Sequence, residues 1–339
     1  MRRRLFSFLL AAALMSVAIA GCGSTNGETK TTTEVKDSET KGQPQGEVGK
    51  DTIKMGISVC LLTEVFVDQV DAFNKEAEGY GNIEITGQFD ANMDSQKQLE
   101  HIQTFVSQGV DVIITSPVDT TIAAEMVELA NGIPIVFTNR APSKDVLSDG
   151  KYCYVGSLET DAGRMQGEYL AGILKDKGLT EVNYIMLIGD LGAENAIQRT
   201  ASAKEALETA GFTLKATLED TANWDRTEAL NKVQQVIGSG KPVDCVIANC
   251  DEMALGAIEA LKDADMLADV PVVSIDGVQN AILAVQSGEM TMTVLQNAQA
   301  QAKEAMKVAV ELAEGKTVEQ YYWVPYEAIT PENVKSYLK

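Results

Sequence analysis

Short apolar runs alternate along most of the chain with amphipathic stretches whose apolar residues recur at helical spacing. Apolar runs of four to eight residues are typical of buried strands, and the helical spacing is typical of helices that cover a sheet. The predicted strands are 53–59, 83–88, 111–116, 134–139, 152–156, 183–189, 212–218, 244–249, 270–276 and 291–296. The predicted helices include 94–107, 120–131, 161–175, 195–210 and 225–237.

Continuous apolar strands that are joined by helices predict an α/β fold with parallel sheets covered on both faces. About ten strands are too many for one such unit in a chain of this length. The pattern therefore favours two doubly wound parallel-sheet (Rossmann-like) lobes, with a boundary between them near 156–158.

Polar residues stand where the predicted strands end. The strand 244–249 ends in Asn249, Cys250 and Asp251, and a helical pattern begins at once. Open parallel sheets bind ligands outside the carboxyl ends of their strands, and the N-terminus of the next helix adds free N–H groups. Asp251 could instead cap its helix. Other strand ends carry Glu64 and Phe66, Ser116 and Asp119, Asn139 and Arg140, Asp190, Asp276, and Gln296.

This set of side chains suits a neutral ligand with many hydroxyl groups. Carboxylates and amides exchange hydrogen bonds with hydroxyls, and arginine donates in a fixed fork. Aromatic rings cover the apolar faces of a sugar ring. Phe66 and Trp224 are the candidate aromatics, although Phe66 could equally pack in the core.

The N-terminus predicts export and lipidation. Arg2–Arg4 precede the apolar segment 5–20, and small residues follow up to Cys22. This order indicates a lipoprotein signal peptide at 1–21, with Cys22 as the lipidated residue. The polar segment 22–50 is expected to be a flexible tether.

The composition argues against several other functions. The chain carries 28 Lys and Arg against 49 Asp and Glu, a formal net charge of -21, so we expect no nucleic-acid partner. Its single histidine, His101, lies within a predicted helix, and no nucleophile-elbow, dinucleotide or phosphate-binding motif is present. We therefore predict no enzyme activity and no cofactor.

Four cysteines remain besides Cys22: Cys60, Cys153, Cys245 and Cys250. No pair has zinc-ligand spacing. Cys245 and Cys250 would lie about 16 Å apart along a strand, too far for a disulfide. We expect buried free thiols, and a bridge between other pairs stays open in an exported protein.

The segments PIVFTNRAPSKDVL, YVGS, DTANWD, VIANCDEMALGAIEALK and TVLQNAQAQAK resemble the type I periplasmic sugar-binding proteins of the ribose/galactose class, and most of all its galactose-binding branch. The resemblance runs from about Asp51 to Leu338. It implies ring-stacking aromatics at Phe66 and Trp224, a hydroxyl-binding arginine at Arg199 and a cleft aspartate at Asp276. The remaining expected ligand-binding residues are Glu64, Ser116, Asn139, Arg140, Asn195, Cys250, Asp251 and Gln296.

The chain also departs from the pattern that the resemblance implies. Cys250 and Ser116 replace asparagines, and Ala193 replaces a histidine. Each change removes a partner for a ligand hydroxyl, at about 1–3 kcal/mol for a buried group. We therefore expect a pocket that is not tuned to glucose or galactose in the usual way. The calcium loop is replaced by KDKGLTEVN, so no metal site is expected.

The resemblance implies a monomeric extracytoplasmic receptor that is anchored to the cell membrane, binds a monosaccharide and delivers it to an ABC transporter permease. The N-terminal lobe would comprise 51–157 and 297–322, and the C-terminal lobe 158–296 and 323–339, with a hinge of three crossings near 157, 296 and 323. A sugar sensor that feeds a chemoreceptor or sensor kinase is the alternative. A secreted two-domain α/β enzyme is a third possibility.

Overall fold

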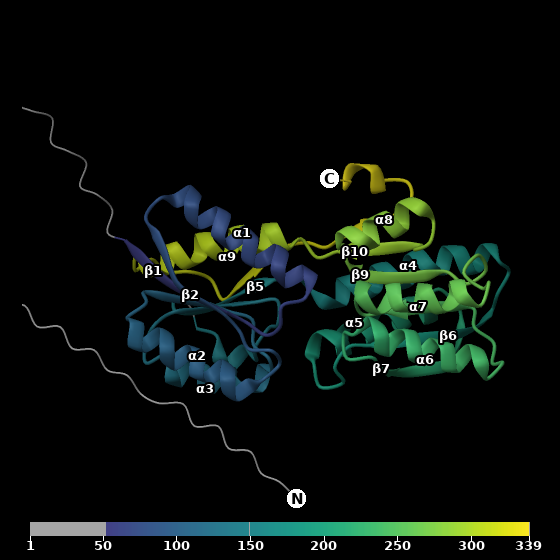
Figure 1. The fold of residues 1–339 in the computed structure, drawn as a ribbon, viewed down its shortest axis with the longest axis horizontal. Helices are drawn as coiled ribbons and strands as arrows, with labels where there is room; N and C mark the ends of the chain where they lie inside the picture. Colours follow the sequence, from purple (N-terminus) through teal and green to yellow (C-terminus); the bar gives the residue numbers. More distant parts are fainter. Residues whose placement is uncertain (1–51, 149, 339) are drawn as a thin grey trace, which may run out of the picture. The chain divides into compact units, whose positions relative to one another are not determined.

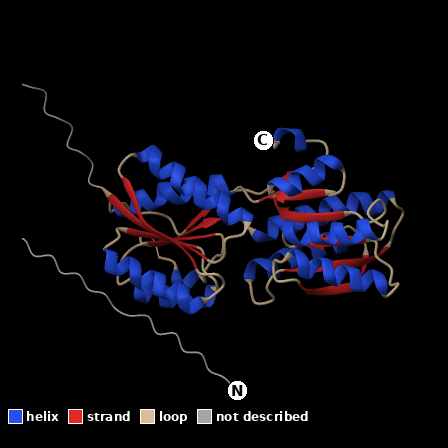
Figure 2. Cartoon of the chain, in the orientation of Figure 1, coloured by secondary structure: helices blue, strands red, loops and turns tan. Residues whose placement is uncertain are grey.

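The computed structural model describes residues 52–148 and 150–338. The predicted signal peptide 1–21, the lipidated Cys22 and the tether 22–50 lie outside the described residues. Helices cover both faces of two separate sheets (Figures 1 and 2). Among the described residues, no helix has the length and apolar character that a membrane span requires.

The first lobe is built on the sheet order β11-β5-β4-β3-β1-β2. Its strands are β1 (Ile53–Val59), β2 (Ile83–Asp90), β3 (Val112–Thr115), β4 (Ile135–Thr138), β5 (Tyr152–Gly156) and β11 (Tyr321–Trp323). Its helices are α1 (Glu64–Tyr80), α2 (Ser95–Gln108), α3 (Ala123–Leu129) and α9 (Ala298–Ala313), with short 3-10 turns η1 (Thr120–Ile122) and η2 (Lys144–Val146).

The second lobe is built on the sheet order β12-β10-β9-β8-β6-β7. Its strands are β6 (Glu181–Ile188), β7 (Thr213–Thr221), β8 (Cys245–Ala248), β9 (Val272–Asp276), β10 (Met292–Leu295) and β12 (Glu327–Ile329). Its helices are α4 (Glu159–Asp176), α5 (Glu194–Thr209), α6 (Arg226–Gly238), α7 (Asp251–Asp263) and α8 (Gln279–Ser287), followed by the 3-10 turn η3 (Val334–Ser336).

All strand pairs within these sheets are parallel except β10 with β12. The central strands β3, β4 and β8 are buried along their whole length, because helices pack on both sides of them. The predicted fold class, two doubly wound parallel-sheet lobes, is confirmed.

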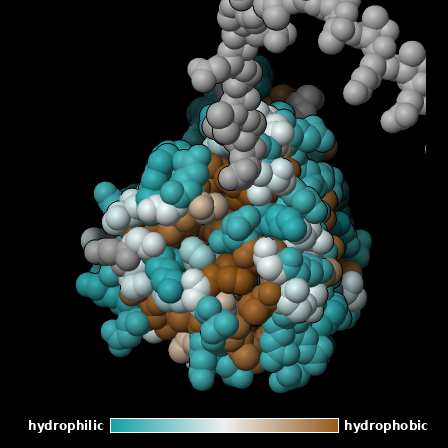
Figure 3. Space-filling model, turned by 90° about the vertical axis from the view of Figure 1, so that its left-hand side faces the viewer, coloured by the Kyte–Doolittle hydropathy of each residue, from teal (hydrophilic) through white to brown (hydrophobic). Residues whose placement is uncertain are grey.

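Each sheet buries one hydrophobic core on each face. In the first lobe, α1 and α9 cover one face and α2 and α3 cover the other (Figure 1). In the second lobe, α4 and α5 cover one face, and α6, α7 and α8 cover the other. The lobe face that Figure 3 presents is largely hydrophilic, with hydrophobic residues gathered near its middle.

The chain passes between the two sheets three times. It leaves the first sheet after β5, returns after β10 through α9, and leaves again between β11 and β12. Trp323 belongs to β11 of the first sheet, whereas the predicted boundary placed it in the second lobe. The connections that follow β5, β10 and β11 therefore carry the residues that join the lobes.

Close packing of α4 on α5 brings the first crossing next to the candidate site. A Cβ atom at Gly163 would lie 2.1 Å from the carbonyl oxygen of Arg199, so only glycine fits there. The two helices approach closely enough for Glu159, the first residue of α4, to reach the Arg199 side chain on α5.

Candidate functional site

Side chains from both lobes line a small inner cavity of about 50 Å³. Most of them stand directly after the carboxyl ends of parallel strands, where the next helix begins. The lining residues are Leu61, Thr63, Val65, Phe66, Asn139, Arg140, Asn195, Arg199, Trp224, Cys250, Glu252, Asp276 and Gln296.

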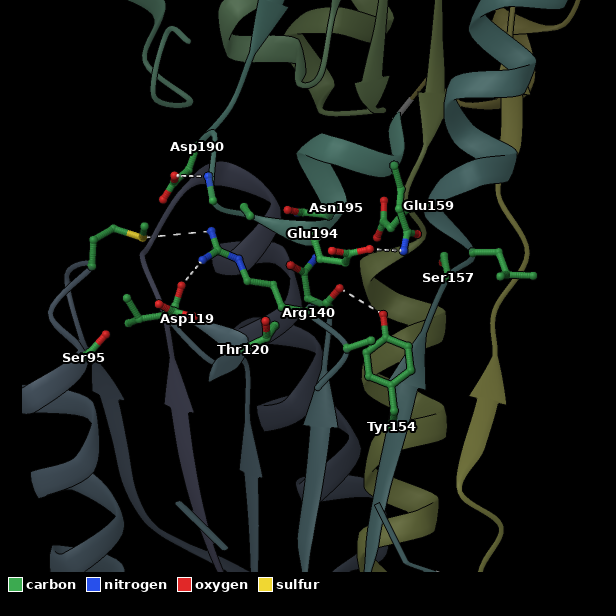
Figure 4. A pocket seen from close by; sticks show the side chains of 18 of the residues that line it. Ser95, Asp119, Thr120, Arg140, Tyr154, Ser157, Glu159, Asp190, Glu194 and Asn195 are labelled. Carbon is green, nitrogen blue, oxygen red and sulfur yellow. Dashed lines mark hydrogen bonds between the residues drawn. The ribbon is translucent and has the colours of Figure 1, made fainter. Parts of the chain in front are cut away.

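A larger outer chamber of about 360 Å³ adjoins this inner cavity (Figure 4). The two share Asn139, Arg140 and Asn195. The outer chamber is further lined by Met93, Ser95, Val118, Asp119, Thr120, Ala141, Tyr154, Ser157, Leu158, Glu159, Asp190, Gly192, Ala193, Glu194, Gln198 and Trp323.

Two aromatic residues, one from each lobe, line the inner cavity. Phe66 lies in the first turn of α1 and is 6% exposed. Trp224 follows β7 with φ 62°, and its Nε1 is buried without a hydrogen-bond partner. A Cβ atom at Gly189 would lie 2.1 Å from the Trp224 ring, so the absence of a side chain at Gly189 allows the ring its position. An aromatic pair of this kind is suited to the apolar faces of a small ring.

Arg199 is 2% exposed and carries the densest hydrogen-bond network of the inner cavity. Its Nε donates to Glu159 Oε2 at 2.6 Å, and its Nη1 donates to the Asn249 carbonyl at 2.8 Å. Its Nη2 donates to Tyr326 Oη at 3.0 Å and to Gln296 Oε1 at 3.3 Å. Burial lowers the pKa of Arg199, but Glu159, Tyr326 and Asp276 outweigh burial and raise this pKa well above its ordinary value.

The partners of Arg199 come from all three crossings between the lobes. Glu159 follows the first crossing, Gln296 follows β10 at the second, and Tyr326 lies between β11 and β12 at the third. Tyr326 Oη also donates to Glu159 Oε2 at 2.8 Å, which closes the network. One guanidinium group therefore joins the cavity wall to every hinge segment.

Asp276 stands at the end of β9 with φ 131°, an unusual backbone conformation for a residue with a side chain. Its carboxylate lies 3.8 Å from Arg199 Nη1. Burial raises the pKa of Asp276 well above its ordinary range; Arg199 opposes the rise, and Asp251 and Glu159 add to it. The Asp276 side-chain oxygens can accept hydrogen bonds from a ligand hydroxyl.

Asn139 and Arg140 bring the polar end of β4 to both cavities. Asn139 adopts φ 61°, and its carbonyl accepts a hydrogen bond from Tyr154 Oη at 3.0 Å. Arg140 donates from Nη1 to the Val118 carbonyl at 2.5 Å, whereas its buried Nε has no partner. The Gln296 Nε2 is also buried without a partner. Free donors next to a cavity are what a ligand with oxygen acceptors requires.

Nine of the predicted ligand-binding residues line the inner cavity, and three do not. The nine are Phe66, Asn139, Arg140, Asn195, Arg199, Trp224, Cys250, Asp276 and Gln296. Cys250 is 5% exposed, and burial raises the pKa of its thiol well above the ordinary value. The three that line neither cavity are Glu64, Ser116 and Asp251.

Asp251 corrects the strand-end prediction because its side chain turns into the sheet. Its Oδ2 accepts from the Val278 N–H at 2.9 Å and its Oδ1 accepts from Thr293 Oγ1 at 2.7 Å. Asp251 is fully buried, and burial raises its pKa to about 7. Its role is to join α7 to β10 and to the start of α8, and Cys250, not Asp251, is the N-cap residue of α7.

Ser116 and Glu64 also point elsewhere. Ser116 is fully buried, and its Oγ lies 3.7 Å from Cys60 Sγ. Glu64 begins α1, and its carboxylate faces the backbone N–H of Gln279 in the second lobe. Burial raises the pKa of Glu64, and the nearby charge of Glu252 raises it further. Glu64 therefore lies at the rim where the two lobes approach each other.

Sequence reasoning missed Glu159 and Tyr326, the residues that hold Arg199. Glu159 lies three residues after β5 and was not among the strand-end residues considered, and Tyr326 follows β11, a strand that the sequence pattern did not predict. The four described cysteines are free and buried, as expected. Among residues 52–148 and 150–338, no group of three or more His, Cys, Asp or Glu side chains is placed to hold a metal ion.

Two hinged α/β lobes that line one cavity with aromatic and hydrogen-bonding side chains define a solute-binding protein. The chain belongs to the periplasmic binding protein domain family, whose family model matches residues 55–317.

Relatives and solved structures agree with this assignment. A solved ABC transporter solute-binding protein from Bacillus halodurans with bound myo-inositol is 37% identical. It has a TM-score of 0.78, over 86% of this chain and 98% of the other. The xylitol-binding protein of Mycolicibacterium smegmatis is 33% identical over 84% of this chain and 79% of its own length. The ribose import binding protein of Salmonella typhimurium is 30% identical over 83% of this chain and 91% of its own length.

Proposed function

We propose that this protein is an extracytoplasmic receptor of an ABC importer, and that it binds a monosaccharide or a cyclic polyol between its two lobes. The observation that carries the proposal is the inner cavity itself. Phe66 and Trp224 reach it from opposite lobes, while Trp224 and Gln296 leave buried nitrogen atoms without partners there. A saturated ring with apolar C–H faces and hydroxyl groups at its rim can contact the aromatic side chains and accept hydrogen bonds from the free nitrogen atoms at the same time.

The chemistry of the cavity favours a neutral ligand over a charged one. Glu252 and Asp276 line the cavity together with Arg140 and Arg199, so neither sign of charge dominates. Myo-inositol, xylitol and ribose, the ligands named for the similar proteins, are all neutral polyhydroxylated molecules. Cys250 offers a weak hydrogen-bonding group where an amide was expected, which favours a ligand without a hydroxyl at that position.

Closure of the lobes over the ligand would be the event that the permease reads. A ligand held by Phe66 and Asn139 on one side and by Trp224 and Asp276 on the other stabilises the closed form by its differential contacts. We expect the closed monomer to dock on a permease. A chemoreceptor or sensor kinase that reads the same closure is the alternative partner.

Isothermal titration calorimetry tests the ligand class. The purified residues 51–339 would be titrated with myo-inositol, D-galactose, D-glucose and D-ribose. We expect micromolar or tighter binding of at least one. Trp224→Ala and Asp276→Ala should abolish this binding, whereas Tyr80→Ala should not, because Tyr80 is an exposed aromatic that lines neither cavity. Failure of every compound to bind would refute the proposal.

The same titrations separate a receptor from an enzyme. The bound compound would be recovered after a long incubation and its NMR spectrum compared with that of the starting material. An unchanged spectrum is expected for a receptor. A stoichiometric or catalytic product would instead favour the secreted two-domain enzyme.

We further propose that Cys22 is lipidated and anchors the chain to the membrane. The proposal is supported by the order of basic, apolar and small residues before Cys22. Cys22→Ser should release the protein from the membrane fraction and abolish its labelling with a radioactive fatty acid. If the variant stays in the membrane fraction and still takes up the fatty-acid label, lipidation at this position is refuted.

A further inference from the structure

The outer chamber offers far more room than the ring cavity beside it. Its volume is about 360 Å³, against about 50 Å³ for the inner cavity, and Asn139, Arg140 and Asn195 line both. The chamber is therefore large enough to hold a chemical group of its own.

An aromatic platform stands in the wall of this chamber. Trp323 is 48% exposed, which is unusual for a tryptophan in a strand. Its ring is stacked on Tyr321 with centroids 5.3 Å apart and an interplanar angle of 8°. The Tyr154 ring meets its edge at 5.7 Å. Two aromatic neighbours fix the indole, and the rest of its surface is left open to a ligand face.

Two buried polar atoms in the chamber wall lack hydrogen-bond partners, and they belong to side chains of opposite charge. Arg140 Nε is a donor, and Glu159 Oε1 is an acceptor. Arg140 is 7% exposed and Glu159 is 7% exposed. Glu159 Oε2 is already engaged by Arg199 and Tyr326, so Oε1 is the oxygen that remains. Figure 4 shows the Arg140 guanidinium within the chamber, between Asp119 and Glu194.

We propose that the outer chamber is a second subsite, which takes a hydroxylated substituent that is covalently attached to the ring in the inner cavity. The ligand class is then an O-substituted cyclic polyol or a disaccharide. The substituent stacks on Trp323, accepts a hydrogen bond from Arg140 Nε and donates one to Glu159 Oε1. This inference rests on the proposed function, because it assumes a ring in the inner cavity.

Paired titrations test the subsite. Myo-inositol would be compared with galactinol, its galactoside, and D-glucose with melibiose and maltose. Calorimetry would be performed on the wild type, Trp323→Ala, Trp323→Phe and the control Tyr80→Ala. We expect at least one substituted compound to bind the wild type. For this compound, Trp323→Ala should weaken binding about tenfold, Trp323→Phe should retain most of it, and Tyr80→Ala should have no effect. Binding of the unsubstituted ring should stay within about twofold in all variants.

The outcomes distinguish the two proposals. If neither the bare rings nor their substituted forms bind, the proposed function itself fails. If a bare ring binds and no substituted form does, the second subsite is refuted. The subsite is refuted as well if Trp323→Ala weakens the bare ring and its substituted form equally, or leaves both unchanged.

Discussion

Replacing Glu159 by glutamine removes one charge from the hinge network without changing the shape of the side chain. Glu159 Oε2 accepts hydrogen bonds from Arg199 Nε and from Tyr326 Oη. The side chains of Arg199 and Glu159 are 2% and 8% exposed, so water cannot replace the lost charge. The carboxylate of Asp276, 3.8 Å from Arg199, remains as the nearest counter-charge.

The expected loss of stability follows from these two hydrogen bonds. A hydrogen bond to a charged group contributes about 1.5–3 kcal/mol and a neutral one about 0.5–1.5 kcal/mol. Glutamine makes the Tyr326 bond neutral and leaves the Arg199 bond with one charged group instead of two, so the substitution should destabilise the protein by about 2 kcal/mol. The weaker pairing of buried Arg199 adds to this, up to the roughly 3–5 kcal/mol seen when one partner of a buried pair is deleted. At about 2 °C per kcal/mol for a large domain, a loss of about 2–5 kcal/mol should lower the Tm by about 4–10 °C.

Thermal denaturation of Glu159→Gln and of a matched control tests this reasoning. Glu168 lies on the same helix and pairs with Arg164 at 2.9 Å, but both side chains are about half exposed. Glu168→Gln should change the Tm by less than about 1 °C, because exposed ion pairs contribute little. Glu159→Gln should also weaken ligand binding, since Arg199 is no longer fixed. Equal Tm values for the two variants would refute the network as a stabilising element.

Two further predictions concern residues around the cavity. Gly189→Ala should weaken ring binding about tenfold or more in calorimetry, because its Cβ would meet the Trp224 ring at 2.1 Å; Gly192→Ala, with its nearest atom at 3.5 Å, should bind as the wild type does. The pKa of Asp251 is about 7 in the folded state and higher than when unfolded, so the stability it contributes at low pH is lost as pH rises from about 4 through 7. In Asp251→Asn the amide oxygen can accept from the Val278 N–H and the amide nitrogen can donate to Thr293 Oγ1, so its Tm should fall less between pH 4 and pH 8 than that of the wild type; parallel Tm profiles would contradict this.

The sequence pattern located strands β1 to β10 because the central ones are apolar runs between polar breaks, and the edge strands β2 and β7 mix apolar with polar residues between helical segments. It missed β11 (Tyr321–Trp323) and β12 (Glu327–Ile329), which are three residues long. A segment of this length shows no periodicity, and its strand conformation comes from pairing with β5 and β10, far away in the sequence. Short strands of this kind can be assigned only once the rest of the sheet is known.

The site was predictable to the extent that strand ends decide it. Asn139, Arg140, Asp276 and Gln296 follow strand ends and do line the inner cavity. The same rule failed for Asp251, because position along the chain does not say whether a side chain turns toward the crevice or back into the sheet. The side-chain direction depends on local backbone angles and on donors such as the Val278 N–H, which no sequence pattern revealed.

The backbone around the cavity adds a reason to regard it as preorganised. Asn139, Trp224 and Asp276 have φ angles of 61°, 62° and 131°, conformations that disfavour residues with side chains. Such conformations cost about 1–3 kcal/mol each and persist where the surrounding structure determines them fully. At Asn139 the fixing contact is the hydrogen bond from Tyr154, and at Trp224 it is the ring packed over Gly189. Because these contacts already hold Asn139 and Trp224 in place, binding can act chiefly on the angle between the lobes.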